Sequence, residues 1–496
     1  MKKIIKASGI LASLVIFFSV HSYAQFEEDV LRLSTPGLGV GARALGMGMA
    51  FTGVANDFSA SYWNPAGLGQ LHMNEVTLGL SHVSYGNTGT LSAGETQLGN
   101  SQSFTNSGTN LNSLGLVYAV PAERGNLVIA LGYGRSADFT TGLSFSGFNP
   151  LSSIIQARMD QGGLGAPDGQ DYPSDFTIAE QLEVAFADTN TGKFISPIHD
   201  SLTQSGKVLE GGGLNNISGS LAFEAAPDLF LGATLSVITG SYSYRRDYSE
   251  EDLHNVYGTF PFDFSSLSLF ETVESDISGV TAKIGTLYKF GPNSRVGVAI
   301  KLPSWINVRE DFSTEAQSTF DNGDVRPKDG PYTSSGSDEF DVTTPFVFSA
   351  GISYGIQRLM LAGDIDYTDW TEMEFRNAND RLLKFNTQIK EDFQPTANIR
   401  LGAEYEAVEG LLQVRGGFDY LPSPYQGDPS SFARKYVTAG IGFIADNAFA
   451  IDLAYAHGYW ETTRINYDYT IKGKQTSRTN EDISTNDLIG TVSFRF

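Results

Sequence analysis

Stretches of alternating apolar and polar residues recur along the chain to its last residue, and this pattern most constrains the fold. Within residues 276–290, Val280, Ile284 and Tyr288 share one face, whereas Lys283 lies on the other. Successive side chains of a β-strand point to opposite faces, so each such strand can meet apolar surroundings on one side and polar surroundings on the other. Segments of ~10 alternating residues are typical of membrane β-barrels.

The sequence predicts fourteen strands whose connections alternate strictly between short and long. The strands are expected at residues 75–85, 111–120, 126–135, 214–225, 229–239, 276–290, 294–303, 340–354, 358–368, 396–406, 411–420, 435–445, 448–459 and 486–496. The long connections are expected near residues 86–110, 136–213, 246–275, 304–339, 369–395, 421–434 and 460–485. The six short connections carry Pro, Gly, Asn and Asp, the usual turn residues. A closed antiparallel barrel explains this alternation and places both termini on the short-turn side. A soluble β-sandwich or propeller is the alternative, but a propeller predicts repeats of ~40 residues, which the sequence lacks.

The N-terminus of the chain carries the features of an export signal. Three early lysines precede an apolar run at residues 10–20, and small residues follow at Ser22 and Ala24. We therefore expect residues 1–24 to be a signal peptide that is cleaved before Gln25. A membrane anchor is the alternative, but a spanning helix needs ~20 apolar residues.

Composition supports an exported barrel and excludes one class of partner. The chain has 54 Gly, 33 Phe, 22 Tyr and no Cys, although export would permit disulfides. Its formal charge of −23 becomes −26 when the three signal lysines are removed. Such a negative chain is not expected to bind nucleic acid, which requires a basic surface. Acidic stretches such as Glu250–Asp252 read as solvated loops, or alternatively as sites where divalent cations bridge to anionic surface lipids.

The segment before the first strand carries a fingerprint of small residues. It includes Gly41-Ala42-Arg43, Leu45-Gly46-Met47-Gly48, Ala50-Phe51, Ala55-Asn56-Asp57 and Asn64-Pro65-Ala66-Gly67-Leu68. These motifs resemble the N-terminal region of the FadL family of long-chain fatty acid transporters, which includes toluene and xylene uptake channels. The resemblance covers under a tenth of the chain, and the strand count and terminal Phe496 extend it less specifically.

The resemblance implies an all-β fold: a fourteen-stranded antiparallel transmembrane barrel (residues 74–496) whose lumen holds an N-terminal hatch (residues 25–73). Hatch residues would then be Arg43, Gly46, Gly48, Asn64, Pro65, Ala66 and Gly67. Glycine permits close approach of backbones, and Asn-Pro-Ala fixes a tight turn, although an ordinary turn would look the same. The amphipathic last strand, with Phe494 and Phe496, resembles the signal read by the outer-membrane insertion machinery.

Binding residues are expected in the loop at 136–213 and in the lumen. The loop carries an apolar cluster that could capture ligand, as loops at this place do in the resembling family, or could pack over the barrel mouth: Phe139, Phe145, Phe148, Leu151, Ile154 and Ile155. Lumen-facing Lys283, Arg400 and Arg415 could bind a carboxylate or pair with nearby acids. The family's third strand kinks inward to make a lateral opening. Here Gly132 and Gly134 could permit that kink, or could only accommodate the hatch.

Motifs for catalysis and metal binding lack their usual context. Gly351-Ile352-Ser353-Tyr354-Gly355 matches the GxSxG nucleophile elbow, but it ends a strand at a hairpin, and His457 is the only later histidine. The histidines show no metal-ligand spacing, and Asp321, Asp324 and Asp329 lack the periodicity of a calcium loop. We expect neither an enzyme nor a cofactor.

The sequence thus predicts an outer-membrane channel for passive uptake of small hydrophobic molecules, such as fatty acids or aromatic hydrocarbons, with lateral release through the wall. Its expected partners are the hydrophobic ligand, outer-membrane lipids and the barrel insertion machinery. The alternative is a FadL-like barrel that serves a protein secretion system as a structural or cargo-shuttle component. The long loop at residues 136–213 would suit contact with such a partner.

Overall fold

The structure is a computed structural model that describes residues 27–121, 125–161, 174–188, 193–258, 263–446, 448–469 and 475–496. None of the helices in these ranges has the length and apolar character needed to cross a bilayer. The expected signal peptide, residues 1–24, lies outside the described residues.

An antiparallel sheet closes on itself, because the first strand pairs with the last from Glu75 opposite Arg495 to Ala93 opposite Ser477. Eleven positions in the wall hold one strand each: β1 (Glu75–Ala93), β3 (Gln102–Val120), β8 (Leu202–Ala226), β9 (Leu229–Glu251), β10 (Phe264–Lys289), β16 (Leu359–Asp369), β18 (Pro395–Val408), β19 (Leu412–Leu421), β20 (Arg434–Ala445), β21 (Phe449–Tyr467) and β22 (Ser477–Arg495). Three positions hold two strands in succession: β4 (Leu127–Asp138) with β5 (Thr141–Asn149), β11 (Ser294–Lys301) with β12 (Trp305–Phe320), and β14 (Tyr332–Thr343) with β15 (Val347–Ile356). The wall therefore has the fourteen positions that the sequence predicts.

Short elements complete the fold. The helices are α1 (Glu27–Ser34), α2 (Ala42–Gly46), α3 (Ala60–Trp63), η1 (Pro65–Gln70), α4 (Ile154–Gln161), α5 (Ser174–Gln181), η2 (Trp370–Glu372), α6 (Asp380–Asp392) and η3 (Ser430–Phe432). The remaining strands are β2 (Thr96–Gln97), β6 (Phe186–Asp188), β7 (Lys193–Ile195), β13 (Val325–Arg326) and β17 (Glu374–Arg376).

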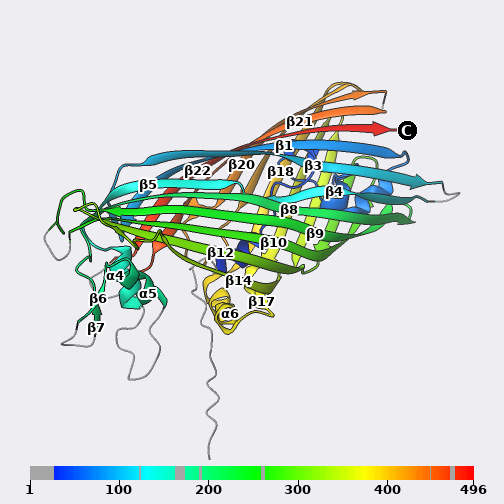
Figure 1. Cartoon of the computed structure of the whole chain (residues 1–496). Helices are drawn as coiled ribbons and strands as arrows, with labels where there is room; N and C mark the ends of the chain where they lie inside the picture. Colours follow the sequence, from blue (N-terminus) through cyan, green and yellow to red (C-terminus); the bar gives the residue numbers. More distant parts are fainter. Residues whose placement is uncertain are drawn as a thin grey trace, which may run out of the picture.

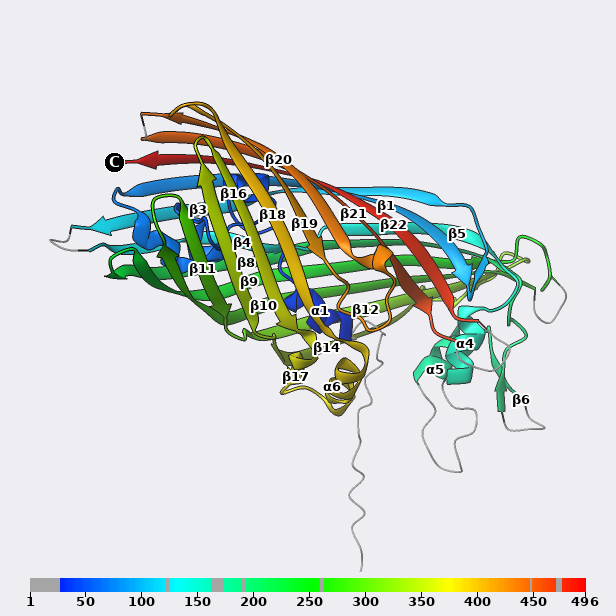
Figure 2. The same ribbon diagram turned by 180° about the vertical axis from the view of Figure 1, so that it is seen from behind.

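The barrel is cut obliquely at its far end. Strands β8, β9 and β10 have 25, 23 and 26 residues, whereas β16 and β19 have 11 and 10. One side of the wall thus projects well beyond the other, and the C-terminus lies at the opposite, short-turn end (Figures 1 and 2). We call the part of the long side beyond the apolar outer face the projecting wall; it comprises residues 81–93, 102–113, 202–216, 239–251, 264–279 and 305–320.

Four predicted long loops are therefore largely strand, which corrects the sequence prediction. The outer parts of β1, β3, β9, β10, β12, β14, β21 and β22 lie in residues 86–110, 246–275, 304–339 and 460–485. Their outward side chains are mainly Ser, Thr, Asn and charged residues, so they lack the apolar alternation that marks a lipid-facing strand. The predicted strand at residues 340–354 is also broken, since it is interrupted around Pro345, which has no N–H to donate.

Apolar side chains form the outer face of the barrel and polar ones face the lumen, as the alternation predicts. Leu401 is 55% exposed, whereas the neighbouring Arg400 is 5% exposed. Val280, Ile284 and Tyr288 are likewise exposed. An exposed apolar belt around a closed wall is the arrangement that lipid requires.

The N-terminal segment, residues 27–71, lies inside the barrel. Its backbone N–H groups donate to side chains from wall positions that are far apart around the circumference. Gly41 donates to Asn112 of β3, Thr52 to Asp364 of β16, and Gly48 to Thr438 of β20. One segment can reach all of these strands only from the lumen, where its helices are seen in Figure 2.

Candidate functional site

The Asn64-Pro65-Ala66 turn joins the N-terminal segment to itself and to the wall. Asn64 Nδ2 donates to the carbonyl of Thr52 at 2.9 Å and to that of Thr286, in β10, at 3.1 Å. Asn64 Oδ1 accepts from the N–H of Ala66, in the first turn of the short helix η1. The buried Asn64 side chain therefore both caps a helix and fixes its position against the barrel.

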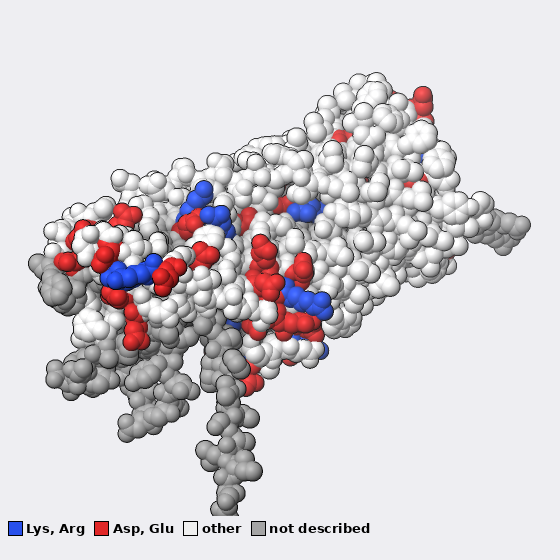
Figure 3. Space-filling model, viewed as in Figure 1, with Lys and Arg blue, Asp and Glu red and all other residues white. Residues whose placement is uncertain are grey.

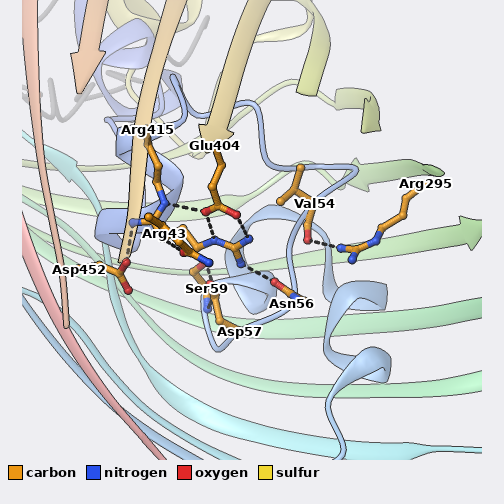
Figure 4. Close-up of polar contacts among 10 residues, drawn as sticks. Arg43, Val54, Asn56, Asp57, Ser59, Arg295, Glu404, Arg415 and Asp452 are labelled. Carbon is orange, nitrogen blue, oxygen red and sulfur yellow. Dashed lines mark hydrogen bonds and ion pairs between the residues drawn. The ribbon is translucent and has the colours of Figure 1, made fainter. Parts of the chain in front are cut away.

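Arg43 connects the segment to charged residues of the wall (Figure 4). Its guanidinium donates to both oxygens of Glu404 at 2.8 and 2.9 Å, and it also donates to Asn56. Arg415 shares Glu404 at 2.7 Å and reaches Asp452 at 2.5 Å. Burial lowers the pKa of Arg43, but Glu404, Asp57 and Asp452 together outweigh this effect and the net pKa shift is upward. Arg43 is thus held as a cation against strand β18.

Gly48 is needed where the segment touches the wall. It adopts a φ of 61°, and a Cβ there would lie 2.5 Å from the carbonyl oxygen of Leu401. Gly46 approaches Gly440 of β20, where an added Cβ would lie 3.1 Å from its Cα. Both predicted hatch glycines therefore lie at close contacts between backbones.

The predicted carboxylate-binding cations differ in their availability. Arg400 pairs with Asp366 at 2.5 Å, and Arg415 is occupied by Glu404 and Asp452. Both guanidinium groups are therefore engaged by acidic side chains. For these two residues the structure agrees with the expected pairing with nearby acids and not with the binding of a ligand carboxylate. Lys283 instead donates to the carbonyl of Tyr62 in the N-terminal segment.

Lys301 is a further inward-facing cation, which the sequence analysis missed. It lies directly opposite Lys283 in the pairing of β10 with β11, and among the described contacts it has no hydrogen bond or ion pair. Like charges placed directly opposite each other across a sheet are destabilising, so the pair has a cost to the fold. Lys301 is the last residue of β11, close to Pro303, so the alternation of apolar and polar residues along the strand did not single it out.

Two adjoining cavities lie between the N-terminal segment and the wall. The outer one has a volume of about 930 Å³ and is lined by nine aromatic residues: Tyr85, Phe139, Tyr242, Tyr244, Phe385, Tyr425, Tyr436, Trp460 and Tyr467. The inner one has a volume of about 110 Å³ and contains both lysines beside an apolar patch: Leu33, Val40, Phe58, Trp63, Leu214, Ile238 and Ile306. Residues 35–37, Ser136, Ala137 and Arg400 line both cavities.

The third wall position is irregular where the two cavities meet. Pairing of β3 with β4 ends at Ser113 opposite Gly134, and β4 shifts register against β8 between Arg135 and Ala137. The chain then continues as β5, which pairs with β8. We call the place where the pairing of β3 with this wall position ends the wall split; beyond it, side chains such as Asn106 bridge β3 to β5.

Two bulged residues at the wall split hold the N-terminal segment. Asn112 is skipped in the pairing of β1 with β3, and its side chain binds the backbone of Gly39 and Gly41. Ser136 lies at the register shift of β4, and its carbonyl accepts from the N–H of Gly37 at 2.9 Å. Bulges are common next to functional sites because they redirect a strand.

The predicted opening residues Gly132 and Gly134 lie just below the wall split. An added Cβ on Gly132 would lie 2.3 Å from the Phe58 ring, and one on Gly134 would lie 2.9 Å from Val40. Both glycines therefore accommodate the N-terminal segment, which is the simpler of the two roles expected for them.

The apolar cluster of the long loop is packed rather than exposed, which corrects the expectation of a water-exposed surface. Phe145 is 1% exposed, Ile154 and Ile155 are buried in α4, and Phe139 is buried against Tyr242. Phe148 and Leu151 are half-buried. The cluster packs because β5 continues the wall, so its inward side chains meet α4 and the inner faces of β8 and β9.

The C-terminal residue Phe496 still pairs with the chain just before β1. Its N–H donates to the carbonyl of Asn74, and the Asn74 N–H donates to the Phe496 carbonyl at 3.0 Å. The rings of Phe494 and Phe496 are stacked, with centroids 5.8 Å apart, and both are exposed on the outer face. The role of Phe494 and Phe496 as an assembly signal stays a prediction.

The GxSxG match lies in a strand, not at a strand-to-helix turn. Ser353 is in β15, and its hydroxyl donates to the carbonyl of Gly53. Within the described ranges, no group of three or more His, Cys, Asp or Glu residues is placed to hold a metal ion. Asp324 instead pairs with Arg326, which lowers the pKa of that carboxyl.

Solved structures share this architecture. A Pseudomonas aeruginosa FadL homologue is 13% identical with a TM-score of 0.58, over 93% of this chain and 100% of its own. The P. putida toluene transporter TodX is 14% identical with a TM-score of 0.54, over 92% and 99%. At such identities these likenesses establish the fold alone.

Sequence comparison identifies the family. No curated protein matches the chain. The sequence model described as outer membrane protein transport protein (OMPP1/FadL/TodX) matches residues 213–496, which is more than half of the chain. Since the closed barrel, its apolar outer face and its internal N-terminal segment agree with that match, the chain belongs to the OMPP1/FadL/TodX family of outer-membrane transport proteins.

Proposed function

We propose that the protein lets small hydrophobic molecules cross the outer membrane down their gradient, without catalysis. The observation that carries this proposal is the pair of adjoining cavities beside the wall split. The outer cavity is lined by aromatic residues, and the inner one combines an apolar patch with two lysines. Ligand sites are typically concave and mostly apolar, with a few polar groups that orient the ligand. Transport proteins and channels found by comparison favour this role over a secretion role.

Residues 25–73 act in this proposal as a hatch that blocks water and polar solutes. A barrel larger than eight strands leaves interior space, so a fourteen-stranded wall needs something to fill it. Support comes from contacts of the segment with β3, β16, β18 and β20. A substrate that cannot pass straight through must then leave sideways or displace the hatch.

The lateral exit lies, we propose, at the wall split, just beyond the predicted Gly132 and Gly134. Ser136 and Ala137 line both cavities, so a molecule in either one contacts the irregular strand. Residues 37–41 of the hatch bind both bulges of the split, which would make movement of this segment the step that opens the route.

The inner cavity favours a hydrophobic carboxylate over a plain hydrocarbon. Lys283 and Lys301 face it together, next to the apolar side chains of Phe58, Trp63 and Leu214. A carboxylate between two ammonium groups relieves their repulsion, while the tail of the ligand contacts the apolar patch. TodX is described as a toluene transporter, so a neutral hydrocarbon is the alternative substrate with which a carboxylate should be compared.

Uptake by cells tests the proposed function. Bacteria that lack other proteins of this type would express the chain, and uptake of labelled oleate at low concentration would be compared with an empty vector. We expect faster uptake, with saturation. Uptake no faster than the control, from protein that is folded in the outer membrane, would refute the proposal.

A further inference from the structure

The outer face of the projecting wall differs in chemistry from the face below it. Exposed large apolar side chains end at Ile217 in β8, at Val237 in β9 and at Val280 in β10. Beyond Val237, β9 continues for roughly 40 Å of extended strand, and its outward residues are Thr239, Ser241, Ser243, Arg245, Asp247 and Ser249. This face is therefore not made for lipid, and charged side chains gather on it in Figure 3.

A groove of about 530 Å³ crosses this face over β8, β9, β10 and β12. Two rows of outward side chains run across it at right angles to the strands. One row is Lys207, Asp247, Phe270 and Glu315, and the other is Ser205, Ser249, Ser268 and Gln317. Neighbouring strands lie ~4.8 Å apart, which is comparable with the width of a sugar ring. Each row therefore offers about one side chain to each sugar.

Phe270 is the aromatic centre of the groove. It lies between two carboxylates, because Asp247 is opposite it in β9 and Glu315 is opposite it in β12. The Arg245 guanidinium covers its ring at 4.6 Å and pairs with Asp247 at 3.4 Å. Phe270 is only half-buried, so part of its side chain stays accessible beside the guanidinium. An aromatic side chain flanked by carboxylate, amide and hydroxyl groups matches a sugar, whose C–H faces pack on rings and whose hydroxyls need acceptors and donors.

The charges of the groove indicate a neutral glycan. Arg245 is engaged by Asp247, and Lys207 lies over the Phe104 ring at 5.4 Å. Among the contacts of the described residues, neither Glu315 nor Lys207 forms an ion pair, so the groove offers one free carboxylate and one free ammonium, and its charges balance. Neutral hydroxyls can donate to Glu315 and accept from Lys207, whereas an anionic sugar would also meet the carboxylates of Glu315 and Asp247.

We propose that this groove binds neutral polysaccharide of the cell's own outer surface. The family is anchored in the outer membrane, and the projecting wall stands where surface polysaccharides surround it. Its inner face lines the outer cavity through Tyr242 and Tyr244, so glycan on the outer face would leave the substrate path clear. The proposal is separate from the transport route and does not depend on which substrate is carried.

Isothermal titration calorimetry of the full-length protein in phosphatidylcholine nanodiscs tests the proposal. The probe is polysaccharide released by mild acid from outer membranes of the producing bacterium and freed of charged fractions. Phe270→Ser should weaken binding roughly tenfold, the effect expected when one aromatic contact is lost. Glu315→Gln should also weaken it, while Thr239→Ala, on the same wall outside the groove, should not.

Heat-modifiable migration on gels would confirm that each variant is folded. Failure of the wild-type protein to bind the neutral fraction would overturn the proposal. Equal binding of the polysaccharide by wild type and Phe270→Ser would also overturn it. So would the finding that the groove binds a partner protein through Phe270 and does not bind the polysaccharide. Uptake of the hydrophobic substrate should be unchanged in Phe270→Ser, which separates this test from that of the proposed function.

Discussion

The Arg43 guanidinium of the N-terminal segment holds both carboxylate oxygens of Glu404 in the wall, at 2.8 and 2.9 Å. Both side chains are largely buried, and Arg415 reaches the same carboxylate from the neighbouring strand β19. Loss of the Arg43 guanidinium would remove two charge-assisted hydrogen bonds from the segment, while Arg415 would still compensate Glu404.

Arg43→Gln should therefore loosen the segment by about 2 kcal/mol and admit ions through the barrel. Conductance of single proteins in planar bilayers would measure the leak. Arg245→Gln is a matched control, because its pair with Asp247 is exposed and should contribute under about 1 kcal/mol. The variant Glu404→Gln takes this counter-ion from both Arg43 and Arg415, so it should leak more than Arg43→Gln, and a smaller leak would contradict this account.

Deletion of residues 25–71 should convert the protein into an open pore. The segment fills the lumen and donates hydrogen bonds to strands on several sides, so its removal leaves a polar channel. Bilayer conductance should rise far above that of the intact protein. If the deleted form is folded yet conducts no better, the hatch assignment is wrong.

The lipid-facing half of the fold could be predicted from sequence, because bilayer contact forces an apolar residue at every second position. Ile399 and Leu401 face outward and Arg400 inward for this reason. The projecting wall could not be predicted in this way, because β9 beyond Val237 has water on its outer face and needs no such alternation. There Ser, Thr and charged residues resemble a loop.

The candidate site was predicted only where a local motif carries it. Asn64 and Gly48 stand in a recognisable segment, and the structure places both at contacts with the wall. Lys301 and the bulged residues Asn112 and Ser136 act through partners distant in sequence. No single-sequence pattern records such pairings, since register between strands is set by the closed sheet.

Phe145→Ser should destabilise the outer part of the barrel rather than only slow uptake. Its ring is buried against Tyr248 and α4, so we expect a loss of about 3–5 kcal/mol. Phe148→Ser should cost less, because Phe148 is half-buried and contacts His254. Thermal unfolding would measure both. Equal effects would indicate that the loop is not packed as described.

Lys283 and Lys301 should decide between charged and neutral substrates. Lys301→Met removes one of two facing cations, so carboxylate uptake should fall several-fold while uptake of a neutral analogue such as oleyl alcohol is unchanged. Lys289 lies near the short-turn end of β10, the strand that also contains Lys283. Lys289→Met is therefore a control that should affect the uptake of neither substrate. Equal losses for acid and alcohol would show that the lysine supports packing and does not recognise the carboxylate.

Bridging the wall split should stop transport. Asn110 of β3 donates to Asp138 of β4 at 2.9 Å across the split, and the natural chain has no cysteine to compete with an introduced pair. In the variant Asn110→Cys/Asp138→Cys, a short bis-methanethiosulfonate linker should reduce uptake to near background, and a reductant should restore it. The linker prevents the two strands from moving apart, so an apolar molecule loses the proposed route to lipid.

Thr239→Cys/Ser278→Cys provides the matched control for this linkage. These residues face each other on the exposed side of the continuous pairing between β9 and β10, so a linker there closes nothing. Uptake should be the same before and after treatment. If the pair at Asn110 and Asp138 is fully linked, as mass spectrometry would show, and uptake persists, the molecule leaves by another route. The remaining path would then run through the lumen, after movement of the hatch towards the short-turn end. Because this movement would also admit ions, the conductance of the linked protein should rise during uptake.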